Sequence, residues 1–169
     1  MRVLALAIAL ALAVPAAAQR EFVAQESDFQ CLTDWKKVHK VRVFNRSKAR
    51  LRKAIRILKR GRANKSYPVG TIIQLVPFEA SVKRGGTFNP EGNGWEFFVL
   101  TPKQDGTTQI RARGGPEVVN VVIPCQQCHG AARAYDFVCE TDHGCIPLNL
   151  DPATIDLIQQ NDLRCRAQP

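Results

Sequence analysis

Hydrophobic and polar positions change their spacing along the chain, and each change predicts an element. The clearest helical pattern follows residue 47, where apolar residues recur at the i, i+3, i+4, i+7 spacing of one helix face: Leu51, Ala54, Ile55 and Leu58. Ser47 is a suitable N-cap, and Gly61 is a suitable stop. We therefore expect a helix that runs from Ser47 to about Arg60.

After residue 67 the pattern changes to short apolar runs bounded by turn residues, which is typical of β-strands. The runs at 70–76, 95–101 and 107–113 are expected strands, and residues 102–106 have the composition of a hairpin turn. Residues 38–44 indicate a short extended piece, residues 118–123 are ambiguous, and a last helix begins at Asp151-Pro152 and runs to about Asp162. These elements predict an α+β fold, largely an antiparallel β-sheet from about residue 70 to 113 with flanking helices.

The N-terminus has the composition of a secretory signal peptide. Arg2 precedes an apolar run over residues 3–18, and Ala16-Ala17-Ala18 supplies a small-residue cleavage pattern. The alternative is a membrane anchor, but a spanning helix needs about 20 apolar residues. We expect a signal peptide at residues 1–18, a single domain at residues 19–169, no membrane span, and a periplasmic or secreted mature protein.

The motif that carries chemistry is C-x-x-C-H at residues 125–129, the attachment signature of a c-type haem. Thiols three positions apart in a helical turn, Cys125 and Cys128, can reach the two vinyl groups of one porphyrin. His129 then lies under the iron as its proximal ligand. Haem attachment follows export, which agrees with the expected signal peptide. We therefore expect one covalent haem c, carried by a C-terminal haem-attachment segment of the fold.

Three other uses of these cysteines stay open. A C-x-x-C pair can be redox-active, although no βαβ pattern precedes Cys125. A zinc site could draw on two cysteine pairs and two nearby histidines: Cys125, Cys128, Cys139, Cys145, His129 and His143. Simple structural disulfides are the third alternative, and an oxidising compartment favours them over zinc.

If two thiols carry haem, four cysteines remain and allow three pairings. Cys139 and Cys145 are close in sequence, and Gly144 eases a tight loop between them. Cys31 and Cys165 lie near the two ends of the mature chain. We expect the disulfides Cys139–Cys145 and Cys31–Cys165.

The order of these features resembles the cytochrome P-460 family, including its cytochrome c-prime-beta branch. The resemblance covers roughly residues 47–138 and is carried by Tyr-Pro-Val-Gly-Thr at 67–71, Gly-Trp at 94–95, the C-x-x-C-H motif and Asp-Phe-Val at 136–138. It implies an antiparallel sheet surrounded by helices and a haem c with histidine below and an open or gas-binding side above. Members of this family oxidise hydroxylamine or bind nitric oxide.

The resemblance also implies which residues lie on the distal side of the haem. The c-prime-beta members have a phenylalanine-rich cap, and here Phe97 and Phe98 fall on opposite faces of a strand, so that one could cap the haem while the other is core. Both being simple core residues is the alternative. His143 is a candidate second axial ligand, or else a surface histidine on a disulfide loop.

The P-460 members carry an additional bond between a lysine and the porphyrin. The expected strand at residues 95–101 contains no lysine, and Lys103 lies in the predicted turn. Lys83 is the better distal candidate but is expected toward a loop, because it precedes a glycine pair. We therefore predict that the cross-link is absent.

Charge adds one candidate partner. The net charge is +9, and residues 36–65 hold fourteen Lys or Arg and no Asp or Glu. This segment is either a docking face for an acidic redox partner or the outer face of an amphipathic helix. No nucleic-acid partner is expected, since no stacking or groove-reading motif accompanies the charge. A homodimer is left open.

Together these features predict an exported mono-haem c-type cytochrome. It would bind a small ligand such as nitric oxide, or perform redox chemistry on a small, hydroxylamine-like nitrogen compound. A pure electron-transfer cytochrome c is the first alternative. An exported binding domain stabilised by zinc or disulfides is the second.

Overall fold

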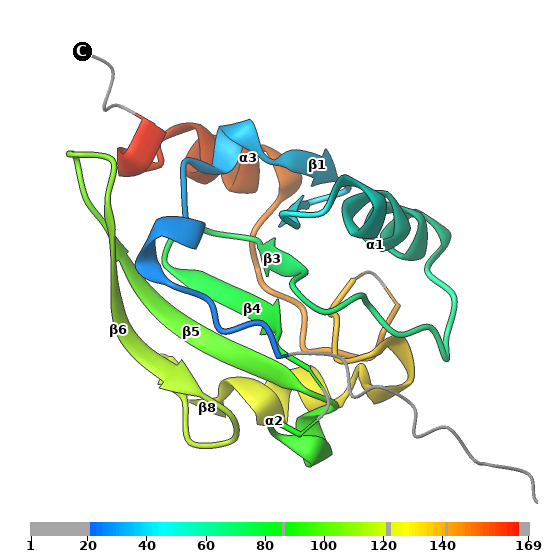
Figure 1. Ribbon diagram of the computed structural model, residues 1–169. Coiled ribbons are helices and arrows are strands. Elements are labelled where there is room, and N and C mark those ends of the chain that lie inside the picture. Colours follow the sequence, from blue (N-terminus) through cyan, green and yellow to red (C-terminus); the bar gives the residue numbers. More distant parts are fainter. Residues whose placement is uncertain (1–20, 86, 121–122, 141, 166–169) are drawn as a thin grey trace, which may run out of the picture.

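The computed structural model describes residues 21–85, 87–120, 123–140 and 142–165 (Figure 1). The expected signal peptide at residues 1–18 lies outside the described residues. The fold is α+β, and six antiparallel strands form one sheet in the order of the sequence. They are β1 (Lys36–Val38), β2 (Val41–Phe44), β3 (Ile72–Gln74), β4 (Glu79–Lys83), β5 (Trp95–Pro102) and β6 (Thr108–Gly114). The predicted α+β class with an antiparallel sheet is confirmed.

The sheet is larger than the sequence pattern predicted. It begins at Lys36 rather than near residue 70, because the hairpin of β1 and β2 pairs with β3, where Val43 lies opposite Ile73. Strand β4 was not predicted, since its two apolar residues stand between charged residues at both ends. The ambiguous segment near residue 120 contributes two short antiparallel strands, β7 (Val119–Asn120) and β8 (Ile123–Pro124).

The two longer helices begin where their caps predicted. Helix α1 (Lys48–Arg60) follows Ser47, whose Oγ accepts a hydrogen bond from the backbone N–H of Arg50, and it ends at Gly61 in the left-handed conformation. Helix α3 (Pro152–Gln160) is capped by Asp151. None of the helices in the described ranges is long and apolar enough to cross a membrane.

The remaining helical segments are short. One is helix α2 (Cys125–Gly130), which holds the C-x-x-C-H motif. The others are single 3-10 turns: η1 (Glu26–Asp28), η2 (Leu32–Asp34), η3 (Pro90–Gly92), η4 (Arg133–Tyr135) and η5 (Leu163–Cys165).

Side-chain alternation along β5 divides the core between the two faces of the sheet. Trp95 and Phe97 point to the face that α1 covers, where they pack with Leu58 and Val43; we call this the α1 face. Phe98 points to the opposite face, where it packs with residues of the N-terminal segment, among them Ala24, Phe29 and Leu32; we call this the N-terminal face. In Figure 1 the blue N-terminal segment runs across this side of β4 and β5.

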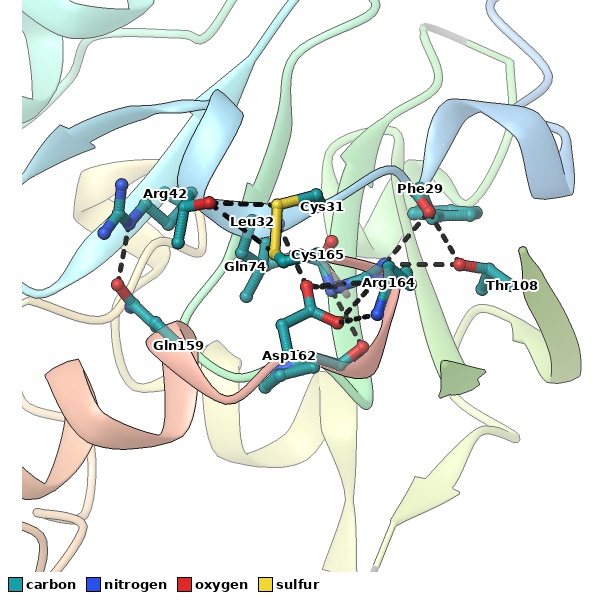
Figure 2. A network of polar contacts seen from close by, with 12 residues as sticks. Phe29, Cys31, Leu32, Arg42, Gln74, Thr108, Gln159, Asp162, Arg164 and Cys165 are labelled. Atoms are coloured by element: carbon teal, nitrogen blue, oxygen red, sulfur yellow. Dashed lines mark hydrogen bonds and ion pairs between the residues drawn. A yellow bond between two sulfur atoms is a disulfide. The ribbon is translucent and has the colours of Figure 1, made fainter. Parts of the chain in front are cut away.

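The two ends of the described chain meet over the N-terminal face (Figure 2). Asp162 and Arg164 form a fully buried ion pair with an Oδ2–Nη2 distance of 2.8 Å. Asp162 also accepts the backbone N–H of Leu32 at 2.9 Å, and Arg164 donates to the carbonyl of Phe29 at 3.1 Å. Because each charge of this pair is balanced by the other and by further hydrogen bonds, the C-terminal segment packs on the core without leaving a buried charge unpaired.

Candidate haem-attachment site

Helix α2 brings the three residues of the haem signature onto one side of a single turn. Cys125, Cys128 and His129 are spaced i, i+3 and i+4, so that their side chains are neighbours on the helix surface. Both cysteines are free thiols and half-buried. Cys125 packs against the core of the α1 face. The motif therefore lies at the edge of a core, not on a solvent-exposed loop.

The other four cysteines form two disulfides. Cys31 bonds to Cys165, and Cys139 bonds to Cys145, which are the two pairings expected from the sequence. A cysteine in a disulfide cannot supply a thiolate to zinc, so the zinc set proposed from the sequence loses two of its ligands. Across the described ranges, no three His, Cys, Asp or Glu side chains group closely enough to hold a metal ion.

The imidazole of His129 is oriented by a backbone carbonyl. Its Nδ1 lies 2.8 Å from the carbonyl oxygen of Phe137, a geometry in which Nδ1–H donates and Nε2 keeps its lone pair. Burial lowers the pKa of His129, which favours the neutral ring. A neutral imidazole with an unprotonated Nε2 is the form that binds a metal ion. The donor set of α2 thus fits a haem iron.

An aromatic residue of the α1 face contacts this histidine. The ring of Phe97 lies 5.1 Å from the imidazole ring, centroid to centroid. The neighbouring Trp95 is fully buried and packs edge-on against Tyr67, with the ring centroids 5.8 Å apart. Phe97 thus contacts the expected iron ligand itself. Phe98 packs instead against Phe29 on the N-terminal face, with the ring centroids 5.0 Å apart.

The position expected for Lys83 was wrong. It is the last residue of β4 rather than part of the loop that follows, and only 4% of its surface is exposed. Its Nζ lies 2.6 Å from Oδ1 of Asp136 and donates to the carbonyl of Asn93 at 2.6 Å. Burial lowers the pKa of the Lys83 amine, and the Asp136 carboxylate opposes that effect. The amine is engaged by these partners, which supports the prediction that no lysine bond to the porphyrin forms.

His143 does not lie on the surface. It is buried, its Nδ1 is 2.7 Å from the carbonyl oxygen of Val138, and its ring stacks on Tyr135 at 3.6 Å. It lines a cavity of about 410 Å³ with His39, Glu140 and the C-terminal end of α1. A separate cavity of about 340 Å³ borders α2, and the two cavities share no lining residue.

Comparisons of the chain with protein-family models, with curated proteins and with solved structures find no match. The similarity to the cytochrome P-460 family therefore remains a hypothesis from the sequence, and the site is interpreted from its own geometry.

Two glutamates of the sheet are less exposed than their sequence context suggests: Glu79 is half-buried, and Glu96 is fully buried. Glu79 accepts a hydrogen bond from Asn120, and burial raises its pKa. Its charge adds to the effect of burial in raising the pKa of Cys125. Glu96 is 1% exposed and binds Arg113 through both carboxylate oxygens, at 2.7 and 3.0 Å. Neither burial has a local sequence signal, because it arises from strand pairing.

Seven of the fourteen basic residues of the segment 36–65 lie on α1. Ala54 and Leu58 are buried, whereas the basic side chains of the helix are exposed, as an amphipathic helix requires. Two cations of the segment have acidic partners, since Lys37 pairs with Asp156 and Arg46 with Asp28. The exposed basic residues between 46 and 65 are Arg46, Lys48, Arg50, Arg52, Lys53, Arg56, Lys59, Arg60, Arg62 and Lys65.

Proposed function

We propose that this chain is an exported protein that carries one covalent haem c, bound through Cys125 and Cys128, with His129 as the iron ligand. One observation carries the proposal. Of the six cysteines, only the two in the C-x-x-C-H turn are free thiols, and the adjacent imidazole already has its Nδ1 placed against a carbonyl. Once bound, the haem supplies an iron centre for ligand binding or electron transfer. Two disulfides fit an oxidising, periplasmic or extracellular compartment.

The thiol chemistry argues against a thioredoxin-like use of the same pair. A redox C-x-x-C motif works through a thiolate whose pKa is lowered. Here burial and the charge of Glu79 raise the pKa of Cys125. A protonated, half-buried thiol is a poor nucleophile for disulfide exchange, so attachment of a cofactor is the better use of this turn.

The leading role is binding of a small ligand such as nitric oxide, or redox chemistry on a hydroxylamine-like compound. Two residues were candidates to close the sixth iron position or to modify the distal side, namely His143 and Lys83. His143 lies at a separate cavity, and Lys83 is paired with Asp136. An iron with histidine on one side and an open position on the other can bind a diatomic ligand.

The chain's own residues serve this role by fixing one side of the iron. The Phe137 carbonyl accepts the Nδ1 proton of His129, and Phe97 packs against the imidazole and excludes water from it. A pure electron carrier is the second candidate, and the exposed cations of α1 favour it. Such a surface attracts an acidic redox partner and accelerates their encounter.

The test combines intact mass with an absorption spectrum, on full-length protein produced in a host that matures c-type haem. We expect the mass of one haem added to the mature chain and a ferrous spectrum that changes when carbon monoxide is added. A Cys125→Ser/Cys128→Ser variant is the control and should carry no haem. A colourless wild-type protein would refute the proposal. A haem spectrum that does not change when carbon monoxide is added would favour the electron carrier.

A further inference from the structure

Asp136 lies at the centre of a buried polar cluster beside the haem signature. Its Oδ1 accepts hydrogen bonds from Lys83 and from the side chain of Asn93. Its Oδ2 accepts the backbone N–H of Tyr67 at 2.7 Å and the hydroxyl of Ser66 at 3.3 Å. The side chains of Lys83 and Asp136 are 5% and 3% exposed. Burying a carboxylate and an ammonium is costly unless hydrogen bonds compensate both. Here the Asp136 carboxylate accepts four hydrogen bonds, and the Lys83 ammonium donates two.

The backbone at this aspartate is in an uncommon conformation. Asp136 and Phe137 follow one another with φ of 56° and 60°, in the left-handed region. For a bulky residue such as Phe137 this conformation is an outlier that costs free energy. Such a turn persists only where the surrounding contacts hold it. The four hydrogen bonds to the Asp136 carboxylate are contacts of that kind.

The strained turn has a direct connection to the site. Its second residue, Phe137, presents the carbonyl that faces Nδ1 of His129. The N–H of Phe137 is itself bonded to the carbonyl of Ala132 at 3.0 Å, so the peptide groups on both sides of the turn are fixed. If the turn relaxed to the right-handed conformation, the carbonyl would swing away from the imidazole.

We propose that Asp136, anchored by Lys83, is a positioning residue that orients the His129 imidazole for the iron. The role rests on the proposed haem function. A carbonyl that accepts the Nδ1 proton fixes the tautomer and makes the ring a stronger electron donor to a metal. Loss of the anchor frees the carbonyl, weakens that donation and favours the ferrous over the ferric state.

The decisive variant is Asp136→Asn, made in full-length protein and studied as isolated. In protein with haem, we expect a raised reduction potential, with about a tenfold change in the ferric-to-ferrous ratio at fixed potential, and a lower iron–histidine stretching frequency. In the haem-free protein, where Nε2 is not bound to iron, nitrogen NMR should show the His129 proton moving from Nδ1 to Nε2. The control is Glu96→Gln, which disturbs a buried ion pair on the N-terminal face and should leave all three readouts unchanged.

A second variant covers the case in which Asp136→Asn does not fold. The pair Lys83→Met/Asp136→Asn removes both charges, so no ion is left buried and unpaired, and it should give the same three changes. An unchanged tautomer, potential and frequency in a folded variant would overturn the positioning role. Absence of haem from the wild type would instead refute the proposed function, while the tautomer measurement still decides the role of Asp136.

Discussion

Each face of the sheet contains an acidic–basic ion pair, but the two pairs stabilise different kinds of backbone. On the N-terminal face, Glu96 pairs with Arg113, which lies on the neighbouring strand opposite Phe98. On the α1 face, Lys83 pairs with Asp136, which lies outside the sheet in a left-handed turn. The first pair joins two extended strands that already hydrogen-bond to each other. The second holds a backbone conformation that would not persist alone, and that turn faces the histidine of the haem signature.

This difference teaches where to look for chemistry in such a fold. A buried ion pair by itself is weak evidence for function, because stable cores also contain them. The pair on the α1 face is informative because it coincides with strained backbone, free thiols and a half-buried imidazole with a fixed tautomer. Matched substitutions on the two faces can therefore separate function from stability.

The largest expected effect is on the haem itself. Cys125→Ser/Cys128→Ser should abolish covalent haem, because no thiol remains to bond the vinyl groups. Cys139→Ser/Cys145→Ser removes the same number of sulfur atoms and should keep the haem. Intact mass and the Soret absorption measure both outcomes. Haem retained by the first variant, or lost from the second, would reverse the assignment of thiols and disulfides.

Next in size is the stabilisation from the two disulfides. Cys31–Cys165 closes a loop with a sequence separation of 134 beside the N-terminal face, and Cys139–Cys145 closes one of 6. In the chain-entropy model the long loop contributes about 5 kcal/mol and the short loop about 2 kcal/mol. Cys31→Ser/Cys165→Ser should thus lower the denaturation midpoint more than Cys139→Ser/Cys145→Ser. Urea titration of both variants checks the order, and equal losses would contradict it.

Two adjacent phenylalanines give the closest matched pair. Phe97→Ala and Phe98→Ala each remove a fully packed ring, and each should cost about 3–4 kcal/mol of stability. Only Phe97 contacts His129, so only its loss should alter the absorption spectrum of the haem protein. Thermal unfolding and the spectrum are read on the same samples. A spectral change with Phe98→Ala and none with Phe97→Ala would place the haem on the other face.

Local sequence patterns predicted the haem signature and many of the secondary-structure elements. They could not predict the long-range contacts that surround the candidate site. The bounds of α1 follow from Ser47 and Gly61, and the haem signature is contiguous, so both could be recognised in the sequence. The partner of Lys83 could not, because Asp136 is 53 positions away. Strand β4 was not predicted for a related reason. A charged residue at each end is typical of a solvent-exposed segment, and the tertiary partners of these charges cannot be recognised in the sequence.

The smallest expected effect compares one substitution at two glutamates, of which Glu79 is half-buried and Glu96 is fully buried. Burial raises the pKa of Glu79, so the folded state holds its proton to a higher pH than the unfolded chain does, and stability falls as pH rises above about 4.5, the usual value. Glu79→Gln keeps an oxygen for the bond from Asn120 but cannot ionise, so the variant should match the wild type in acid and exceed it near neutral pH. Glu96→Gln should instead lower stability at neutral pH, because Arg113 loses the carboxylate that binds it through two oxygens. Melting temperatures between pH 4 and 8, with the exposed Glu91→Gln as a reference of little effect, give the sign at each site. If both substitutions changed the melting temperature in the same direction, the two faces would not differ in their response to the loss of a carboxylate. The difference between the faces would then depend on the backbone at Asp136 alone.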